Sequence, residues 1–387
     1  MLLDRLTEKY ARYRDDCLLR MQVVVQSQKD NLIKIWNQEF INFTSNDYLN
    51  IARDNRVKKS LAEAAENYGL GSSSSAVVSG YSKPHQLLEQ KFAEFLNRDK
   101  TILFNSGYHA NLGVICSLAN RNSNIIADKL CHASIIDSIR LSGASYARYK
   151  HNDINHAESL LQETDRNCLL ITEGIFSMEG DITPADKLAE KCSQYEAVLA
   201  IDDAHSIGVL GENGRGICEY YNLTQQKVPV LIIPLGKAFG SMGAIVAGNE
   251  NLINSIRQFA RSYVYSTALP PAIVSATLKA VEIIEQESWR RQRLLELIYF
   301  FVEHASKIGL CLVSNDLTPI KSIIIGKNSD TVEVQNKLKD KGFLVSCIRP
   351  PTVPVNTARI RISLNCAHSK QQIITLLESL LEIMETI

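Results

Sequence analysis

The sequence lacks the features that mark several classes of protein. Its 42 basic side chains are balanced by 42 acidic ones, so the formal net charge at neutral pH is zero. Nucleic-acid-binding proteins need a strong positive surplus somewhere, and no segment supplies one. The short basic clusters at residues 58–59 and 289–293 lie in segments of helical period, where solvated faces are common. We therefore predict that both clusters lie on the surface.

Long hydrophobic runs are also missing. The longest, Val228 to Leu235 and Ile320 to Ile325, fall far short of the roughly 20 residues of a membrane-spanning helix. The first nine residues mix charged and apolar side chains, unlike a secretory signal. The nine cysteines are odd in number and form no Cys-x-x-Cys pair, a pattern typical of reduced, buried thiols. We predict a cytoplasmic protein.

The composition that is present is that of a folded globular protein. Apolar residues make up 45% of the 387, which is enough chain for two or three domains. We expect an N-terminal helix and strand segment at residues 1–50, with the helix over roughly Leu3 to Arg20, and this segment packs with the small domain. A large domain is expected at residues 51–285, and a small C-terminal α+β domain at residues 286–387.

A regular alternation of short apolar strands and helical segments begins near residue 100. This rhythm predicts an α/β fold with a mostly parallel sheet covered on both faces. The expected strands are Thr101 to Phe104, Asn124 to Ala127, Cys168 to Thr172, Ala197 to Ile201, Val230 to Pro234 and Ala244 to Ala247. Ligands of such sheets bind beyond the carboxyl ends of the strands, so the residues that follow each strand are the candidates for chemistry.

The first of these strand ends can hold a phosphate. Ser106 is expected to cap the next helix, and the free backbone N–H groups of Gly107 and Tyr108 can then bind an anion. His132 follows the second strand at the same edge. Each signal alone has an ordinary structural explanation, namely a helix cap and a structural histidine.

Two further strand ends carry groups that need a partner. A long polar loop, residues 173–181, follows the third strand and offers Ser177 as a hydrogen-bond donor. Asp202 and Asp203 end a strand that is too apolar for unpartnered carboxylates. A metal is disfavoured, because adjacent residues of a strand point to opposite sides and no second ligand cluster is present. A cationic heteroaromatic ring held by one Asp is the better candidate.

Lys237 follows the next strand, among small residues that let the backbone approach closely. The segment is not a phosphate-binding Walker loop, because Leu231 stands where that motif needs Gly and Ala238 where it needs Ser or Thr. A buried lysine amine of this kind suits Schiff-base chemistry with an aldehyde. Together, the phosphate cradle, stacking imidazole, aspartate and lysine match the needs of pyridoxal 5′-phosphate.

The whole chain resembles the α-oxoamine synthase family of fold-type I pyridoxal-phosphate enzymes. The resemblance rests on the order and spacing of four motifs: Phe-x-Ser-Gly-x-x-Ala-Asn at 104–111, His-Ala-Ser at 132–134, Asp-Asp-Ala-His-Ser at 202–206 and Gly-Lys-Ala-Phe-Gly at 236–240. It implies a transferase, more narrowly an acyltransferase. The implied fold is a large domain with a mostly parallel seven-stranded sheet and a small C-terminal α+β domain.

The resemblance also implies roles for individual residues at the cofactor. Lys237 would bond to the cofactor aldehyde, and Asp202 would pair with the pyridine nitrogen. His205 and Ser177 would contact the phenolic oxygen of the ring, and His132 would stack on it. Lys237, His132, Asp202 and His205 form the implied catalytic group.

The remaining implied contacts concern the phosphate and the substrates. Gly107 and Tyr108 would bind the phosphate, together with Ser266 and Thr267 on a strand of the neighbouring subunit of a homodimer. The positions that match substrate contacts are Arg20, Asn46, His132, Arg349, Thr352 and Arg361.

Within the family, the C-terminal segment indicates the substrates. The double proline after Arg349 is similar to the biotin-pathway branch, which condenses L-alanine with a pimeloyl group carried by coenzyme A or acyl carrier protein. Glycine-using members, which make 2-amino-3-oxobutyrate or 5-aminolevulinate, typically have Tyr-Pro there. An aminotransferase, a non-catalytic relative and a merely structural Lys237 are further alternatives.

One residue departs from the family pattern. Pro234 stands where Thr is usual, three residues before the lysine, and Pro has neither a hydroxyl nor an N–H group. We therefore expect weakened cofactor binding unless Ser266, Thr267 or water compensates.

Overall fold

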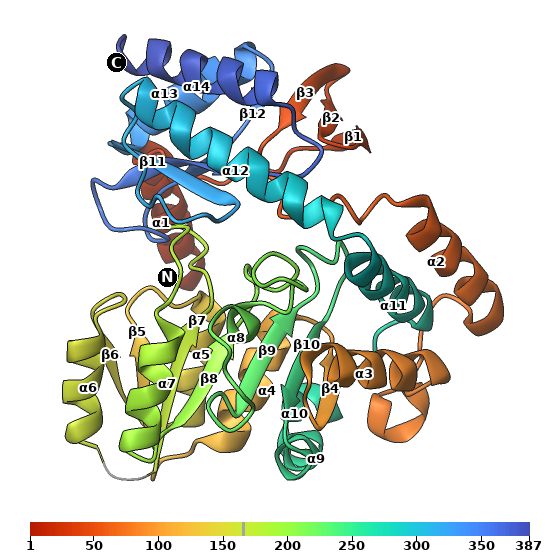
Figure 1. Ribbon diagram of the computed structural model, residues 1–387. Helices are drawn as coiled ribbons and strands as arrows, with labels where there is room; N and C mark the ends of the chain where they lie inside the picture. The colour runs from red at the N-terminus through yellow and green to blue at the C-terminus, as the bar shows by residue number, and fades with distance from the viewer. Residues whose placement is uncertain (165–166) are drawn as a thin grey trace. The chain divides into compact units, whose positions relative to one another are not determined.

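The computed structural model describes residues 1–164 and 167–387, and the chain divides into two compact units. The large unit comprises Ile51–Phe176 and Ile182–Arg291. The small unit comprises Met1–Asn50, Ser177–Asp181 and Gln292–Ile387. Figure 1 labels their elements. The division of the chain at residues 50 and 285 stays a prediction.

A seven-stranded sheet in the order β4-β10-β9-β8-β7-β5-β6 forms the centre of the large unit. Neighbouring strands are parallel, except that β10 runs antiparallel to both β4 and β9. The strands are β4 (Lys100–Phe104), β5 (Asn124–Asp128), β6 (Ser145–Tyr149), β7 (Cys168–Glu173), β8 (Val198–Asp202), β9 (Val230–Pro234) and β10 (Ala244–Gly248). The predicted α/β fold with a mostly parallel sheet is thus confirmed.

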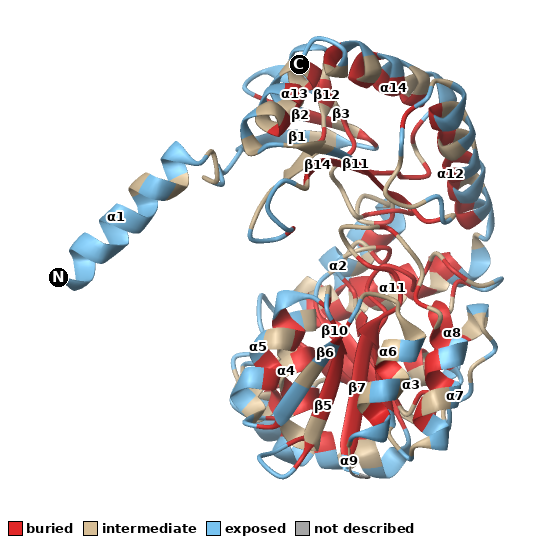
Figure 2. Ribbon diagram, turned by 90° about the vertical axis from the view of Figure 1, so that its left-hand side faces the viewer, coloured by how far each residue is buried: buried red, intermediate tan, exposed pale blue. Residues whose placement is uncertain are grey.

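Helices cover both faces of this sheet, with α4 and α5 on one side and α6 and α7 on the other (Figure 2). All six residues of β7 are buried, as expected for a strand between two helical layers. The helices of the large unit are α2 (Asn55–Tyr68), the π-helix η1 (Ala76–Gly80), α3 (Lys83–Leu96), α4 (Gly107–Leu118), α5 (Ala133–Ser142), α6 (Ile154–Gln162), α7 (Ala185–Gln194), α8 (Ile217–Tyr220), α9 (Glu250–Phe259), α10 (Arg261–Val264) and α11 (Pro271–Gln286).

Local sequence signals explain where several of these helices begin. The Ser106 hydroxyl accepts a hydrogen bond from the His109 N–H at 3.2 Å, so the predicted cap of α4 is present. Pro271 opens α11, where its fixed φ suits the first turn. Asp54 caps α2 by accepting from the Arg56 N–H at 3.0 Å. These residues fix the first turns of α4, α11 and α2, and α4 directly follows the strand β4.

The sheet topology brings several polar strand ends to one edge. Because β10 is antiparallel to both neighbours, β4 runs in the same direction as β9 and the other parallel strands. Their carboxyl ends, at Phe104, Asp128, Glu173, Asp202 and Pro234, therefore lie at the same edge of the sheet. In open α/β sheets this edge is where ligands bind.

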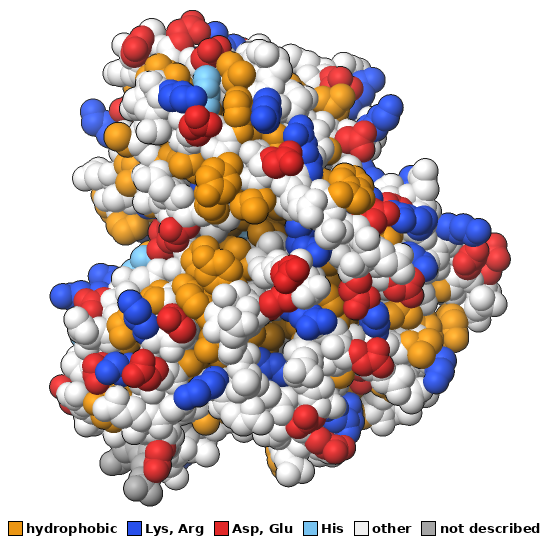
Figure 3. Space-filling view, in the orientation of Figure 1, with side chains coloured by type: hydrophobic (Ala, Val, Ile, Leu, Met, Phe, Trp, Pro, Cys, Tyr) orange, Lys and Arg blue, Asp and Glu red, His pale blue; other side chains and the backbone are white. Residues whose placement is uncertain are grey.

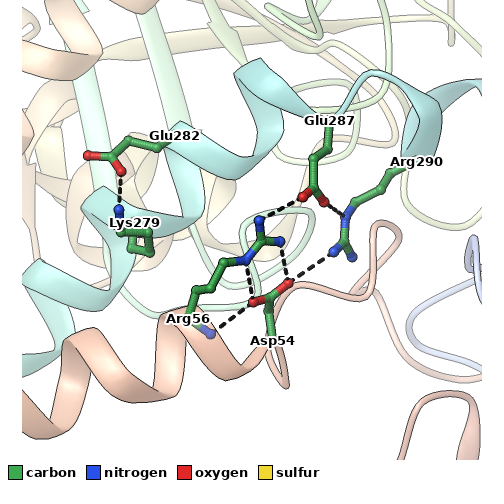
Figure 4. Close-up of polar contacts among 6 residues, drawn as sticks. All are labelled: Asp54, Arg56, Lys279, Glu282, Glu287 and Arg290. Atoms are coloured by element: carbon green, nitrogen blue, oxygen red, sulfur yellow. Dashed lines mark hydrogen bonds and ion pairs between the residues drawn. The ribbon is translucent and has the colours of Figure 1, made fainter.

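The prediction for the basic cluster at residues 289–293 was wrong for two of its members. Lys58 and Lys59 are exposed, but Arg290 and Arg291 are buried. Arg290 donates to Asp54 at 3.0 Å and to Glu287 at 2.8 Å, in a network that Arg56 completes (Figure 4). Four ion pairs among two cations and two carboxylates compensate the cost of burying the Arg290 guanidinium. The helical periodicity of the sequence could not reveal these partners.

The small unit contains a four-stranded sheet in the order β1-β2-β3-β12 and a three-stranded sheet in the order β11-β14-β13. Its strands are β1 (Val25–Lys29), β2 (Leu32–Ile35), β3 (Gln38–Asn42), β11 (Ile320–Gly326), β12 (Phe343–Leu344), β13 (Ser346–Ile348) and β14 (Ala358–Ser363). Its helices are α1 (Leu2–Asp15), α13 (Asn328–Asp340) and α14 (Lys370–Met384), with α12 (Trp289–Lys307), whose first turn belongs to the large unit. All six residues of β14 are buried.

Two finer expectations differ from the structure. The N-terminal helix was expected to reach Arg20 but ends at Asp15, because Cys17 adopts a left-handed φ of 57° that breaks the helix. None of the nine cysteines is in a disulfide, but Cys311 is exposed rather than buried, since it lies in the connection after α12.

Among the described residues, no helix is long and apolar enough to cross a membrane. Acidic and basic side chains are interspersed on the face drawn in Figure 3.

Candidate active site

Asp202 ends β8 with one carboxylate oxygen bonded and the other without a partner. Its Oδ2 accepts a hydrogen bond from Asn111 Nδ2 at 2.7 Å. Its Oδ1 is buried and has no hydrogen-bond partner among the described residues, and the residue is only 4% exposed. A buried carboxylate oxygen without a donor is costly. Oδ1 is therefore available to an N–H group of a ligand.

The adjacent Asp203 has a different, structural environment. Its carboxylate accepts hydrogen bonds from the Ser206 hydroxyl and from the Ile217 N–H at the start of α8. Burial raises the pKa of Asp203 to about 7. An added Cβ at Gly216 would clash with this carboxylate, so the loop after β8 is built tightly around it. The two Asp side chains thus face different partners, as expected for neighbours on a strand.

His132 caps α5 with its imidazole. Its Nδ1 accepts a hydrogen bond from the Ser134 N–H at 3.2 Å and lies 2.7 Å from Ser134 Oγ. Burial lowers the pKa of His132, and the positive charge of Lys237 lowers it further, while Asp202 raises it. A neutral imidazole with Nδ1 as an acceptor is the state that these contacts favour.

Glu173, the last residue of β7, supports His132 from the main chain. Its Oε1 accepts a hydrogen bond from the His132 N–H at 2.5 Å. Burial raises the pKa of Glu173 well above its usual value, and the charge of Asp202 raises it further. Lys237 acts in the opposite direction on the same carboxyl group. The site is therefore a compact group of ionisable side chains at the sheet edge.

Lys237 lies in the loop after β9 and belongs to this group. Its charge acts on His132 and on Glu173, and Asp202 acts on the same two residues, so all four side chains lie within electrostatic range. The sequence suggested a buried lysine, but Lys237 is only half-buried. Solvent access at the end of β9 explains the difference, because the preceding Gly236 is exposed.

The start of α4 forms the expected anion-binding end of a helix. The N–H groups of Gly107 and Tyr108 lie in the first turn, where no acceptor within the helix exists. A Cβ added at Gly107 would lie 2.8 Å from Pro234 Cγ, so only Gly allows this approach of α4 to β9. The Tyr108 hydroxyl points away and donates to Asp137 at 2.6 Å.

Ser266 and Thr267 lie beside this helix start in the same chain. The Thr267 carbonyl accepts a hydrogen bond from Asn105 Nδ2 at 2.7 Å. The expectation of a strand here was wrong, because Thr267 forms only an isolated bridge with Ser75 after α10 ends at Val264. His205 is buried in the turn after β8.

Arg361 and Asn46 come together in the small unit. The Arg361 guanidinium donates to the Ser177 carbonyl at 2.6 Å, to Ser363 Oγ at 2.9 Å and to Asn46 Oδ1 at 3.2 Å. All three acceptors are uncharged, and Arg361 forms no ion pair with a described residue although it is only 5% exposed. Burial lowers the pKa of Arg361. A buried cation without a counterion is suited to bind an anionic ligand.

The other small-unit residues form a second group near the end of α1. Arg20 Nη2 donates to Thr352 Oγ1 at 3.2 Å, and both side chains are exposed. Arg349 is half-buried and donates to the carbonyls of Cys17 and Leu19, at 3.1 Å for Leu19. The Arg349 contacts therefore fix the backbone just before Arg20.

Sequence reasoning assigned no role to three residues of the large-unit site. Asn111 and Ser134 stand inside the motifs at 104–111 and 132–134, and only their side-chain bonds to Asp202 and His132 reveal their positions. Glu173 could have been noted as a polar strand end, like Asp202. Among the described residues, no group of three or more His, Cys, Asp or Glu side chains could hold a metal ion.

Comparisons with known proteins agree with this fold. The family model for class I and II aminotransferases matches residues 38–380. The chain is 40% identical to 8-amino-7-oxononanoate synthase from Cellvibrio japonicus over 98% of this chain and 95% of that protein. It is 42% identical to the synthase of the same name from Ectopseudomonas mendocina, with 94% of each chain covered.

Solved structures extend the comparison. A structure of 8-amino-7-oxononanoate synthase from Francisella tularensis superposes with a TM-score of 0.81 at 37% identity, covering 90% of this chain and 98% of that one. Serine palmitoyltransferase from S. paucimobilis, with bound PLP–myriocin, gives a TM-score of 0.93 at 26% identity, covering 99% and 98%. The chain belongs to the class I and II aminotransferase family and, within it, to the group of the 8-amino-7-oxononanoate synthases.

Proposed function

We propose that the protein is a pyridoxal 5′-phosphate-dependent acyltransferase that makes 8-amino-7-oxononanoate. The reaction condenses L-alanine with a pimeloyl thioester of coenzyme A or acyl carrier protein and releases carbon dioxide and the free thiol. The names of the relatives, which cover nearly the whole chain, support this assignment. The observation that carries it is the unpartnered Oδ1 of Asp202, in a site that also contains Lys237 and His132.

The residues present fit the cofactor. Asp202 Oδ1 is an acceptor for a ring N–H, and a carboxylate at this position would keep the pyridine nitrogen protonated. The first turn of α4, at Gly107 and Tyr108, offers N–H groups to a phosphate. Lys237 supplies the amine that would bond to the aldehyde, and we propose that His132 packs on the ring and that His205 and Ser177 bind its phenolic oxygen.

The cofactor, when bound, withdraws electrons from the Cα atom of an amino acid joined to it. Side chains of the protein must then remove and return the Cα proton. Lys237 is the base that we propose removes the Cα proton of alanine and later returns a proton to the product, because a neutral lysine amine can accept a proton and this side chain lies within electrostatic range of His132 and Glu173. Asp202 Oδ1 is the proposed acceptor for the ring nitrogen, and the neutral His132 adds no competing positive charge.

Substrate selection is assigned to the small-unit residues. Arg361 is the proposed receptor for the carboxylate of the amino acid, because it is a buried cation whose described partners are all uncharged. Asn46 holds one end of that guanidinium. Arg20, Arg349 and Thr352 are proposed to contact the acyl donor, which carries negative charge on its terminal carboxylate.

Two further properties belong to this proposal. Ser266 and Thr267 are proposed to reach the phosphate in the partner subunit of a homodimer, for which the exposure of Thr267 leaves room. A cytoplasmic location is consistent with nine cysteines that form no disulfide.

The experiment that tests the assignment compares amino acids and acyl donors on the purified holoenzyme. Alanine and glycine are each assayed with pimeloyl, succinyl and acetyl thioesters, and products are identified by mass spectrometry. We expect 8-amino-7-oxononanoate from alanine and the pimeloyl donor. Turnover of glycine in preference to alanine would instead identify a glycine-using synthase.

A further inference from the structure

A buried hydrogen-bond chain connects Asp202 to His132 behind the proposed cofactor site. Asn111, on α4, donates from Nδ2 to Asp202 Oδ2 at 2.7 Å and to Ser134 Oγ at 2.9 Å. Ser134, on α5, lies with its Oγ 2.7 Å from His132 Nδ1. The chain thus joins two helices and a strand, and both Asn111 and Ser134 are 1% exposed.

The direction of every hydrogen bond in this chain follows from its ends. Asp202 Oδ2 can only accept while the carboxylate is ionised, so the Asn111 amide must turn its NH₂ group toward it. The Ser134 hydroxyl accepts from that NH₂ group and therefore uses its own proton on His132 Nδ1. The Ser134 N–H also points at Nδ1, at 3.2 Å, and a backbone N–H can only donate.

We propose that Asn111 and Ser134 are positioning residues that orient Asp202 and His132 for the cofactor. Asn111 occupies Oδ2 of Asp202, which leaves Oδ1 as the oxygen for the ring nitrogen. Ser134 occupies Nδ1 of His132, which fixes the neutral tautomer that carries its proton on Nε2. The inference rests on the proposed function only for the identity of the ligand.

Packing alone does not account for this arrangement. Asn111 Oδ1 is buried and has no hydrogen-bond partner among the described residues, so the amide is oriented by its NH₂ contacts although its carbonyl loses a bond. An apolar side chain of similar size would avoid that loss if the position only joined α4 to α5. Titratable groups that interact electrostatically with Asp202 or its neighbours include His132, Glu173, Lys237, Asp203, Asp128 and Asp137.

The test measures pyridoxal 5′-phosphate affinity by absorbance for the wild type, Asn111→Ala and Asn111→Asp. Loss of a buried hydrogen bond to a charged group predicts a dissociation constant raised roughly 10- to 100-fold in Asn111→Ala. In Asn111→Asp, two neighbouring carboxyls can share a proton at pH 6 but repel each other at pH 8. We therefore expect its affinity to fall as the pH rises, which the wild type should not do. The matched control is Ser117→Ala, on the same helix.

A second measurement needs no cofactor. Nitrogen-15 spectra of the imidazoles in the cofactor-free full chain, with His132 assigned by His132→Gln, report its tautomer. We expect the Nε2-protonated form in the wild type and a shifted Nδ1 signal in Ser134→Ala. Thermal unfolding checks that each variant is folded. If Asn111→Ala does not fold, the His132 tautomer in Ser134→Ala tests the positioning role.

The outcomes separate the two proposals. Unchanged affinity at both pH values in the Asn111 variants, or a His132 protonated on Nδ1, would overturn the positioning role and leave the proposed function intact. A different outcome is a wild type that fails to bind pyridoxal 5′-phosphate while His132 has the expected tautomer and its signal shifts in Ser134→Ala. That result would overturn the proposed function, and the positioning role of Ser134 toward His132 would stand.

Discussion

Two neighbouring buried arginines of β14 allow a sharp test of substrate binding. Arg359 donates to Glu179 at 3.0 Å, and the side chains are 5% and 13% exposed. Arg361 is equally buried but has only uncharged partners. The perturbation is the same substitution at each position, Arg359→Met and Arg361→Met. Both positions lie in the same buried strand, and the difference that the comparison uses is that Arg359 has a carboxylate partner and Arg361 has none among the described residues.

The expected magnitudes follow from that difference. Arg359→Met removes one partner of a buried ion pair, which costs about 3 kcal/mol or more of unfolding free energy. Arg361→Met removes a buried charge that has no counterion, and its loss of hydrogen bonds to neutral acceptors is offset by the removed desolvation cost. A lost charge-assisted contact to the amino-acid carboxylate is worth about 1.5 to 3 kcal/mol, roughly a 10- to 150-fold rise in KM for alanine.

The assay combines urea unfolding with steady-state kinetics on the holoenzyme. We expect Arg361→Met to raise KM for alanine while its stability falls less than that of Arg359→Met. Arg361→Lys keeps the charge but loses the planar fork, so its KM should lie between those of the wild type and Arg361→Met. An unchanged KM for alanine in Arg361→Met, or a larger loss of stability there than in Arg359→Met, would refute the reasoning.

Two other predictions concern the cofactor and the pH dependence of stability. Pro234→Thr adds a hydroxyl beside Gly107 at the start of α4 and should tighten pyridoxal 5′-phosphate binding; an affinity that does not improve would end the idea. Burial lowers the pKa of His368 from 6.5 to about 4. The folded state therefore favours the neutral ring, and its stability should fall by about 3 kcal/mol as the pH drops from 6.5 to about 4. Urea unfolding across this range should show a flatter profile for His368→Gln than for the wild type or the control His156→Gln, and identical profiles would contradict the role of His368.

The fold could be predicted from the sequence because buried strands appear as clear runs of apolar residues. The strands between helical layers, such as β7 and β8, are continuous apolar runs, and their polar ends at Glu173 and Asp202 mark the edge of the sheet. The strand β6 was not predicted, because it lies at the edge with an irregular, largely exposed pattern.

Features that depend on tertiary partners could not be predicted from the sequence. The burial of Arg290 depends on Asp54, which lies 236 positions away in the chain. The role of Asn111 depends on Asp202, 91 positions away. Local patterns contain no information about such partners. The motifs indicated which segments carry the chemistry, but the hydrogen bonds that orient their side chains required the structure.

The central claim is that the amine of Lys237 bonds to the aldehyde of pyridoxal 5′-phosphate in the site that contains Asp202. The most direct measurement is borohydride reduction of the protein saturated with the cofactor, followed by peptide mass spectrometry. We predict a phosphopyridoxyl group on Lys237 and its disappearance in Lys237→Ala, together with the visible absorbance. A label on another lysine, or no label, would contradict the account.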